Sequence, residues 1–399
     1  MAIINICGFE LGSILEFFEL YNTASIQTTT KRTGSYALRV NPVGAGTGWV
    51  YIRSIQPDGL ETTINSASVY ARFYFRVDTL PAANSEEFME IRSSNIILTG
   101  RIKSDGKLQL YASNGTTQIG SDSSTALVTG TWYRIDIKFI SGSSCELRIN
   151  GTSEITGVPG TDTVSNITLG KLADRNNQSV DFYYDDVAID TAEYPPPGAI
   201  EVMQVEADGN YTAWTIGAGS GDKWQQIDEI PYDSDTSYLV STLNINDAYT
   251  AALKSATSED ISGTINTIKS IIICKQDGAV GGTYARRLRS NTTDSDGANS
   301  TSVSVYGAGS RMFATDPATG VAWTVSGLNS VEIGVVEKES INKTRITGIY
   351  LMVDFQASTG GGGGSKGKKP PIIKPPRGGG GGGGKNNPNF RHRIWILDN

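Results

Sequence analysis

The sequence predicts an all-β protein with two β-sandwich domains and an extended C-terminal tail. Three observations lead to this prediction. Apolar and polar residues alternate in many short segments, turn-forming residues separate these segments, and 46 glycines and 14 prolines disfavour long helices. At 399 residues the chain is also too long for one compact core, so we expect more than one domain.

Residues 131–139 show the clearest alternation, as expected of a strand with one buried face. Tyr133, Ile135, Ile137 and Phe139 fall on one side, and Arg134, Asp136 and Lys138 fall on the other. Residues 145–151 alternate again after a Ser/Gly turn, which predicts a hairpin. Further strands are expected at residues 68–77, 87–93, 107–113, 166–170 and 180–190. This number of short strands predicts two stacked sheets over residues 1–194.

Three segments of this first domain resemble a known family. They are GTWYRIDIKFISGSSCELRINGT (130–152), NITLGKL (166–172) and VDFYYDDVAID (180–190). Together they resemble the laminin-G-like, concanavalin-A-like jelly roll, which implies a jelly-roll-like sandwich for the first half of the chain. This fold supports lectins, glucanases and virion modules alike, so the resemblance implies no single function.

A proline-rich linker at residues 195–198 separates a second β-sandwich domain at residues 199–357. Its strands are expected at residues 200–207, 236–242, 267–276, 283–290, 300–307, 330–338 and 344–355. The segments WQQIDEIPYDSDTSYLVST (224–242) and ATDPATGVAWTVSGLNSVEIGV (314–335) resemble a module of phage structural proteins. The resemblance implies a bacteriophage virion structural protein.

Residues 358–399 form a Gly/Lys/Pro-rich tail without hydrophobic periodicity. Its glycine runs suit a flexible tether, or alternatively closely packed glycine strands in an oligomer. The tail carries a net charge of +7 and the rest of the chain −14, which indicates an acidic partner. Apolar residues at the end of a tether predict a docking peptide for assembly. These residues are Phe390, Ile394, Trp395, Ile396 and Leu397.

The sequence predicts no catalytic residue, and therefore no enzyme. The single histidine, His392, lies in the tail, and no Ser/His/Asp or Cys/His arrangement can form inside either domain. Asp181 and Asp185 share one face of a strand, but their backbones lie about 13 Å apart at roughly 3.3 Å per residue. That separation is wide for paired glycosidase carboxyl groups.

No metal site or cofactor is predicted either. Cys7, Cys145 and Cys274 show no zinc-ligand spacing, and Cys145 and Cys274 are expected to be small buried residues within strands. Asp185 and Asp186 leave two alternatives open, since they either accept hydrogen bonds from loop amides or help to bind calcium.

One sheet face is the candidate ligand-binding face of the first domain. Tyr70, Arg72, Tyr74 and Arg76 alternate with apolar residues along residues 68–77. Tyrosine and arginine suit sugar stacking and protein contacts. They suit ordinary cross-strand pairing equally well.

These observations favour a structural component of a phage virion, tail-fibre-like or on the capsid surface as a decoration or head-fibre protein. It would act in assembly or host-surface attachment. The alternatives are a lectin that recognises a host polysaccharide and an endoglycanase. Expected partners are other virion proteins, copies of itself in a homotrimer, and a host-surface glycan. Nucleic acid is not favoured, because no aromatic-interleaved basic face occurs.

We expect the protein to be made in the host cytoplasm and to reside on the virion surface. Its N-terminus lacks the basic and apolar regions of a signal peptide, and three cysteines do not form a disulfide framework. Membrane insertion is not expected, because the sequence has no stretch of about 18 apolar residues.

Overall fold

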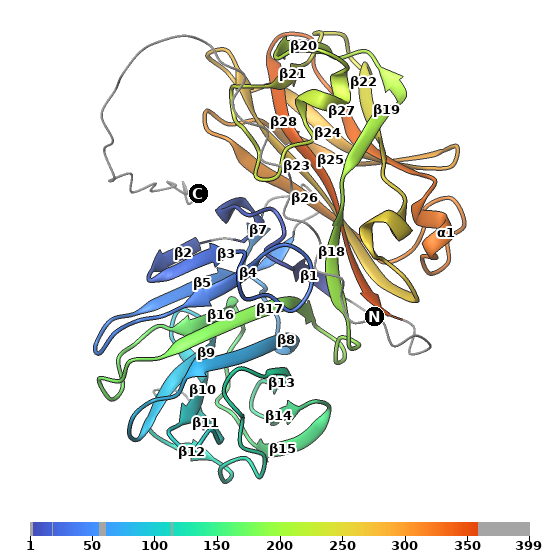
Figure 1. Ribbon diagram of the computed structural model, residues 1–399. Helices are drawn as coiled ribbons and strands as arrows, with labels where there is room; N and C mark the ends of the chain where they lie inside the picture. Colours follow the sequence, from blue (N-terminus) through green and yellow to red (C-terminus); the bar gives the residue numbers. More distant parts are fainter. Residues whose placement is uncertain (1–2, 18, 56–60, 113–114, 358–399) are drawn as a thin grey trace.

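The computed structural model describes residues 3–17, 19–55, 61–112 and 115–357. These residues form two β-sandwiches that lie against each other (Figure 1). Within them, α-helical structure is limited to the single turn α1 (Val325–Leu328). The predicted all-β class is therefore confirmed.

The first sandwich consists of an eight-stranded and a seven-stranded antiparallel sheet, and a short ribbon of β6 (Ser54–Ile55) and β7 (Glu61–Thr62) adjoins them. The eight-stranded sheet has the order β15-β14-β13-β8-β17-β4-β3, with β1 also paired to β17. The seven-stranded sheet has the order β12-β11-β10-β9-β16-β5-β2. The strands of the first sheet are β1 (Ile3–Cys7), β3 (Ala24–Gln27), β4 (Ala37–Val40), β8 (Ser68–Thr79), β13 (Trp132–Ile140), β14 (Ser144–Ile149), β15 (Thr152–Gly157) and β17 (Asp181–Asp190). The strands of the second are β2 (Glu19–Asn22), β5 (Gly48–Ile52), β9 (Ser85–Arg92), β10 (Ile96–Lys103), β11 (Leu108–Ala112), β12 (Gln118–Ile119) and β16 (Asn166–Lys171).

The alternation read from the sequence determines which side chains fill the first core. Ile135, Ile137 and Phe139 of β13 are fully buried, and β13 pairs with β14 as the predicted hairpin. Phe75 of β8 stacks on Phe88 of β9 at 5.0 Å between ring centroids, which links the two sheets. Burial of large aromatic rings contributes strongly to the stability of such a core.

The second sandwich has a six-stranded sheet in the order β20-β21-β28-β23-β26, with β18 also paired to β28. A five-stranded sheet in the order β19-β22-β27-β24-β25 lies opposite. Trp214 is fully buried in the core between them. The strands of the first sheet are β18 (Ala199–Met203), β20 (Thr215–Ala218), β21 (Tyr238–Val240), β23 (Thr264–Asp277), β26 (Gly307–Phe313) and β28 (Lys343–Gln356). Those of the second are β19 (Val205–Thr212), β22 (Ala248–Leu253), β24 (Thr283–Ser290), β25 (Thr293–Thr301) and β27 (Val331–Glu337).

One predicted strand of the second sandwich is wrong. Residues 302–306 are a loop between β25 and β26, although Val303 and Val305 alternate with serines. Both valines are exposed, so neither packs into a core that would hold these residues in a strand. The sequence analysis also missed β25, because this edge strand is polar along its length.

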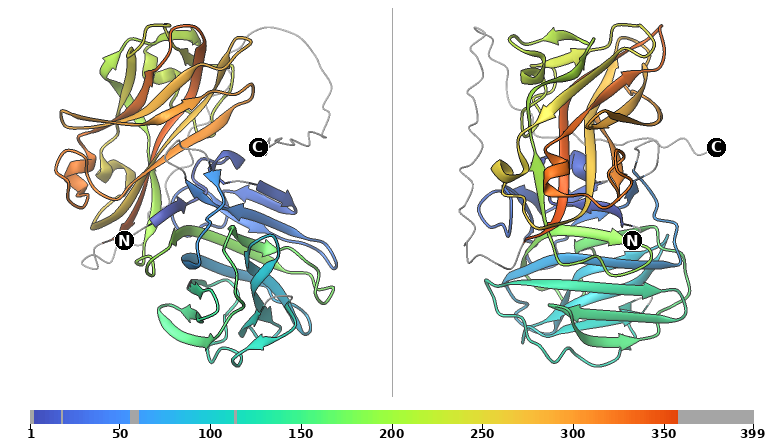
Figure 2. Two further views of the ribbon diagram at one scale, coloured as in Figure 1. Left: turned by 180° about the vertical axis from the view of Figure 1, so that it is seen from behind. Right: turned by 90° about the vertical axis from the view of Figure 1, so that its right-hand side faces the viewer.

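An apolar cluster joins the two sandwiches, and both views in Figure 2 show them in contact. It lies between β1 and β17 of the first sandwich and β18, β23 and β28 of the second. Lys269 of β23 is buried beside it and donates hydrogen bonds to Ile6 O at 2.5 Å and Asn5 Oδ1 at 3.0 Å. The buried members of the cluster are Ile6, Leu11, Ala188, Ile200, Val202, Ile271, Ile273, Tyr350 and Met352.

None of the described strands of the first sandwich pairs with a strand of the second, and residues 191–198 connect the two groups. The predicted domain bounds themselves stay a prediction. The predicted tether and docking peptide, residues 358–399, lie outside the described residues. A search of the described residues finds no helix with the length and apolar character needed to cross a membrane.

Candidate functional site

The candidate face on β8 is largely occupied by contacts within the chain. Arg72 is 0% exposed and forms a bidentate ion pair with Asp354 of the second sandwich, at 3.0 and 3.2 Å. Tyr74 is buried beneath the Arg32 guanidinium, which lies 3.3 Å from its ring centroid. The second sandwich and the loop that carries Arg32 therefore cover the middle of the predicted face.

The two ends of that face are half-buried. Tyr70 packs edge-on against Tyr194, with ring centroids 5.2 Å apart. Arg76 forms a bidentate contact with Asp78, at 2.6 and 3.1 Å. Both side chains thus contact other residues of the same chain. Ligand binding at this face stays a prediction.

The acidic residues of β17 have structural partners. Asp181 accepts two hydrogen bonds from Arg39, at 2.9 and 2.8 Å. Asp185 accepts from the Arg32 amide at 2.8 Å, and Asp186 accepts from the Ile200 amide at 2.6 Å. This is the loop-amide alternative considered above, and burial raises the pKa of Asp185, with adjacent Asp186 adding to the rise. Across the described ranges, no group of three or more His, Cys, Asp or Glu residues is arranged to hold a metal ion.

A second polar surface lies on the outer face of the seven-stranded sheet. Three aromatic rings form a row over β2 and β5, where Trp49 stacks between Tyr21 and Tyr51 with centroid distances of 4.7 and 4.3 Å. Cross-strand pairing of Tyr21 with Trp49 produces the first contact. Tyr21 at the outer end of this aromatic row is 44% exposed, so the row begins at the solvent.

A charged cluster follows the aromatic row across the same face. We use this name for Glu87, Glu90, Arg92, Arg101 and Arg175. Glu90 accepts a hydrogen bond from Arg92 at 2.9 Å and faces Arg175 Nη2 at 3.6 Å. Arg175 also donates through Nε to Glu87, so it bridges both carboxyl groups. Beyond it, the Arg101 guanidinium lies 4.0 Å above the Tyr111 ring on β11.

A β-bulge in β9 places both acids of the charged cluster on the outer face. Met89 is opposite Gly100 and Glu87 is opposite Arg101, so Phe88 is an extra residue in the register. Phe88 and Met89 both point into the core, and both are fully buried. In a regular strand, residues three apart lie on opposite faces, so the sequence analysis had no reason to pair Glu87 with Glu90. Two adjacent apolar residues, Phe88 and Met89, interrupt the alternation and were the one signal of a bulge in the sequence.

The electrostatics of the charged cluster favour a protonated Glu90. Burial, followed by the neighbouring Glu87 carboxylate, raises the pKa of Glu90 to about 8, although Arg92 opposes the shift. Burial also lowers the pKa of Arg101, and Arg175 adds to that effect. Glu90 can therefore donate a hydrogen bond at neutral pH, while arginines form the more exposed layer above it.

Four buried side-chain atoms of this face make no hydrogen bond to any described residue. They are Glu90 Oε1, Thr99 Oγ1, Arg101 Nε and Arg175 Nη2. Thr99 lies on β10 between Glu90 on β9 and Tyr111 on β11, and is fully buried. Buried polar groups are generally satisfied, so these atoms offer donors and acceptors to a ligand or to water.

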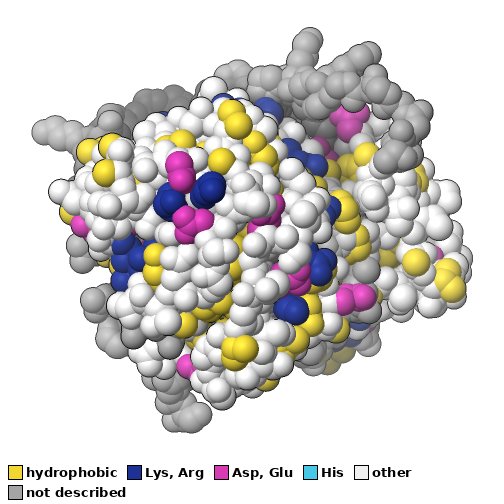
Figure 3. All heavy atoms as spheres, turned by 90° about the horizontal axis from the view of Figure 1, so that it is seen from below, with side chains coloured by type: hydrophobic (Ala, Val, Ile, Leu, Met, Phe, Trp, Pro, Cys, Tyr) yellow, Lys and Arg dark blue, Asp and Glu magenta, His cyan; other side chains and the backbone are white. Residues whose placement is uncertain are grey.

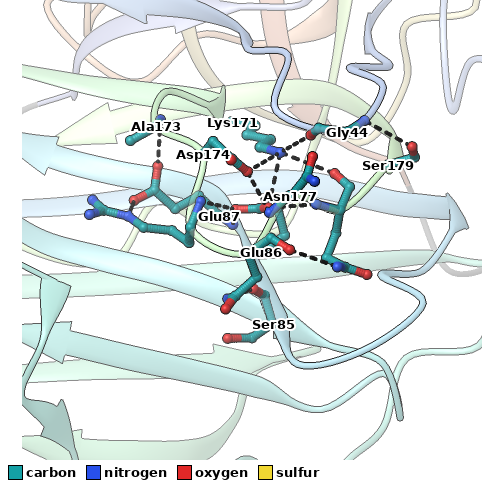
Figure 4. A network of polar contacts seen from close by, with 12 residues as sticks. Gly44, Ser85, Glu86, Glu87, Lys171, Ala173, Asp174, Asn177 and Ser179 are labelled. Carbon is teal, nitrogen blue, oxygen red and sulfur yellow. Dashed lines mark hydrogen bonds and ion pairs between the residues drawn. The ribbon is translucent and has the colours of Figure 1, made fainter.

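The loop that carries Arg175 is anchored by a buried network (Figure 4). Lys171, fully buried at the end of β16, pairs with Glu86 at 3.0 Å. Its Nζ also donates to Gly44 O, Asp174 Oδ1 and Gln178 O, at 2.7, 3.0 and 3.0 Å. Glu86 in turn accepts from the Arg175 amide at 3.1 Å. This Lys171 network thus fixes the backbone on which Arg175 extends over β9.

Figure 3 shows the underside of the first sandwich. Viewed from below, it shows mostly uncharged surface, with basic side chains lying close to acidic ones (Figure 3). The stacked aromatic row next to a cluster of buried charges makes the outer face of the seven-stranded sheet the candidate site.

Comparisons with known proteins concern only the fold. No family model matches the sequence, and no curated protein matches it. Among solved structures, the cellulose induced protein Cip1 is 16% identical, covers 47% of this chain and 97% of its own, and has a TM-score of 0.37. The alginate lyase from Corynebacterium sp. is 12% identical over 41% of this chain and 79% of its own, with a TM-score of 0.32.

The binding domain of Paraclostridial Mosquitocidal Protein 1 covers more of the chain. It is 13% identical over 63% of this chain and 75% of its own, with a TM-score of 0.35. These similarities assign no activity to this chain.

The predicted absence of enzymatic activity is contradicted. Alginate lyases and a Trypanosoma rangeli sialidase are among the solved structures to which this chain is similar. Regular strand geometry would also place Glu87 and Glu90 on opposite faces, whereas the bulge in β9 brings these two carboxyl groups to the same face. The fold class gives no ground for excluding catalysis.

Proposed function

We propose that the first sandwich binds a glycan on the outer face of its seven-stranded sheet. One observation carries this proposal: the aromatic row on β2 and β5 and the charged cluster on β9 and β10 lie on the same face of a single sheet, with only β16 between them. Aromatic rings contact the apolar C–H faces of sugars, whereas arginine and carboxyl groups bind hydroxyl and carboxylate groups.

Tyr51 connects the two halves of the proposed site. Its pKa is raised mainly by burial, and Arg92 and Glu90 also act on it electrostatically. An extended sugar chain would therefore contact Tyr21 and Trp49 first, and then Arg92 and Arg175. The protonated Glu90 and the hydroxyl of Thr99 lie beneath the arginines as hydrogen-bonding groups.

The experiment compares two faces of the same sandwich. Binding of neutral and acidic polysaccharides is measured by calorimetry for the wild type and for Trp49→Ala and Arg92→Ala. Tyr70→Ala and Arg76→Ala, on the opposite sheet, are the matched controls. We expect at least about a tenfold loss of affinity for the first pair, since a desolvated aromatic or charge-assisted contact contributes on the order of 1.4 kcal/mol or more.

Retained affinity in Trp49→Ala and Arg92→Ala would contradict the proposed site. A loss confined to Tyr70→Ala and Arg76→Ala would move the ligand to the face predicted on β8. New reducing ends in the same incubations would add hydrolysis to binding, and Glu90→Gln would then be the variant to compare.

We also propose, on the sequence resemblance of residues 224–242 and 314–335, that the glycan-binding chain is part of a phage virion. In that setting it would attach the particle to a host-surface polysaccharide, either as a tail-fibre-like protein or on the capsid surface. Labelled antibody against the purified protein should decorate intact particles of the phage that encodes it. Particles that bind no antibody would exclude the virion location.

A further inference from the structure

Four loops of the second sandwich carry an unusual amount of exposed apolar surface. They lie at the end where β28 begins and comprise residues 241–247, 278–282, 302–306 and 338–342. Five of the twelve large apolar residues that are exposed in the described ranges lie on these loops. The five, which we call the loop-end patch, are Ile245 (57% exposed), Val280 (59%), Val303 (55%), Val305 (53%) and Ile341 (79%).

Backbone hydrogen bonds hold these loops beside one another, so the five side chains belong to one end of the molecule. Backbone hydrogen bonds connect each loop, or a residue close to its end, with another of the four loops or a residue close to that loop. These bonds run from Gln276 N to Val303 O (2.8 Å), Ser302 N to Gly282 O (2.9 Å), Lys338 N to Thr283 O (2.9 Å), Asn246 N to Glu337 O (2.9 Å) and Ser241 N to Thr344 O (3.0 Å). Grouped exposed apolar residues on a folded domain mark interaction sites.

The sequence of the C-terminal segment suits this surface. Residues 390–397 contain Phe390, Ile394, Trp395, Ile396 and Leu397. Aromatic and aliphatic side chains of this kind are typical anchors of a docking peptide, because they gain most from burial against apolar groups. The valine and isoleucine side chains of the loop-end patch are apolar partners against which these anchors could be buried.

The length of the chain allows the contact. β28 leads away from the loop end for 14 residues, or about 46 Å at roughly 3.3 Å per residue. Residues 358–389 then follow and can extend over about 110 Å at roughly 3.5 Å per residue. The segment can thus return to the loop end of its own chain or reach that of a neighbouring copy.

Charge adds a second argument. The tail carries +7, and the rest of the chain carries −14. Arg391 and Arg393 lie within the apolar segment, so the segment would bring positive charge to a body whose net charge is negative.

We propose that the loop-end patch is the docking surface of the C-terminal segment 390–397. The contact buries the exposed aliphatic side chains of both partners. It is independent of the glycan site, which lies on the other sandwich. If the segment comes from a neighbouring copy, the interface is heterologous and joins copies head to tail.

The test uses the full chain with a photo-crosslinking phenylalanine analogue in place of Trp395. After irradiation and digestion, mass spectrometry identifies the crosslinked peptides. We expect crosslinks to the peptides with residues 278–282, 302–306 or 338–342. Mixing unlabelled and ¹⁵N-labelled copies assigns each crosslink to the same chain or to a neighbour, and either assignment supports docking at the patch.

The variants make the test specific. In a chain with Val303→Ser, Val305→Ser and Ile341→Ser, the crosslinks to these loops should fall at least about tenfold. Val321→Ser is the matched control, because Val321 is 61% exposed on another loop of the same sandwich. A circular-dichroism melt checks that the triple variant is folded. Unchanged crosslinks in the triple variant, or crosslinks confined to other surfaces, would overturn the proposal.

Discussion

Arg72 of β8 and Asp354 of β28 form a bidentate ion pair, at 3.0 and 3.2 Å, in which neither side chain is exposed. The two residues are far apart in the sequence and belong to different sandwiches. Arg72 also donates to Asp186 O and Pro196 O, so the pair lies within a hydrogen-bonded junction. Burial of two charges is tolerated there because each satisfies the other.

The first prediction concerns this pair. Arg72→Ala leaves Asp354 buried without its main counter-charge, and we expect the free energy of unfolding to fall by about 3–5 kcal/mol. The measurement is urea unfolding followed by tryptophan fluorescence. Arg72→Met combined with Asp354→Leu should recover most of the loss, because neither charge of this pair is then left buried without its partner.

Arg76→Ala is the control for this prediction. Arg76 lies on the same strand but pairs with Asp78 at a half-exposed position, where loss of a pair costs at most about 1 kcal/mol. Equal destabilisation by Arg72→Ala and Arg76→Ala would show that the buried pair does not hold the junction.

The second prediction concerns Lys171, which we regard as a positioning residue of the proposed glycan site. Lys171→Met removes the partner of buried Glu86 and releases the loop at residues 172–179. We expect faster amide hydrogen exchange in that loop and weaker glycan binding. The double variant Lys171→Met and Glu86→Gln should regain stability but should not regain the full affinity.

This combination separates positioning from folding. A purely structural role of Lys171 would let affinity return together with stability in the double variant. Unchanged hydrogen exchange at residues 172–179 would show that the loop does not depend on the Lys171 network.

The third prediction concerns pH. The folded protein keeps Glu90 protonated up to a pKa of about 8, whereas the unfolded chain loses that proton near the ordinary value of 4.5. Unfolding between these pH values therefore releases a proton, and the free energy of unfolding decreases as pH rises from about 4.5 to 8. Glu90→Gln cannot ionise, so its stability should decline less over this range.

Unfolding curves of the wild type and Glu90→Gln at half-unit pH steps test this directly. The difference between the two proteins isolates Glu90 from the other buried carboxyl groups. A difference that does not change between pH 4.5 and 8 would contradict the raised pKa of Glu90.

The fourth prediction concerns the three cysteines. Cys7, Cys145 and Cys274 are buried and form no disulfide. Burial raises the pKa of Cys145 and of Cys274 to about 11, so little reactive thiolate forms at neutral pH. Thiol-reactive dye should label the native protein much more slowly than the urea-unfolded protein. Rapid labelling of a cysteine in the folded chain would contradict its burial.

The fold follows from the sequence where a strand has one buried face. In β13 and β14, alternation alone places Ile135, Ile137 and Leu147 in the core. Prediction from alternation fails where the side chains do not pack against a core, as in β25 and at Val303 and Val305. Alternation predicts burial only when a second layer covers the strand.

The candidate site was harder to predict because its geometry depends on contacts distant in sequence. Glu87 and Glu90 meet only because β9 is bulged against β10, and Arg175 reaches them from a loop about 85 residues further along the chain. Composition showed that tyrosines and arginines alternate on β8. It did not show that the second sandwich covers Arg72.

By itself, the sequence determined that this chain forms layered sheets, because a two-residue apolar period has one stable solution, a strand with one face against a core. Tertiary structure alone decided which outer faces stay accessible. A one-residue bulge reverses the facing of every side chain beyond it, and docking of one sandwich on another buries a face that local alternation marks as polar. Both effects depend on long-range packing, which a local pattern does not encode.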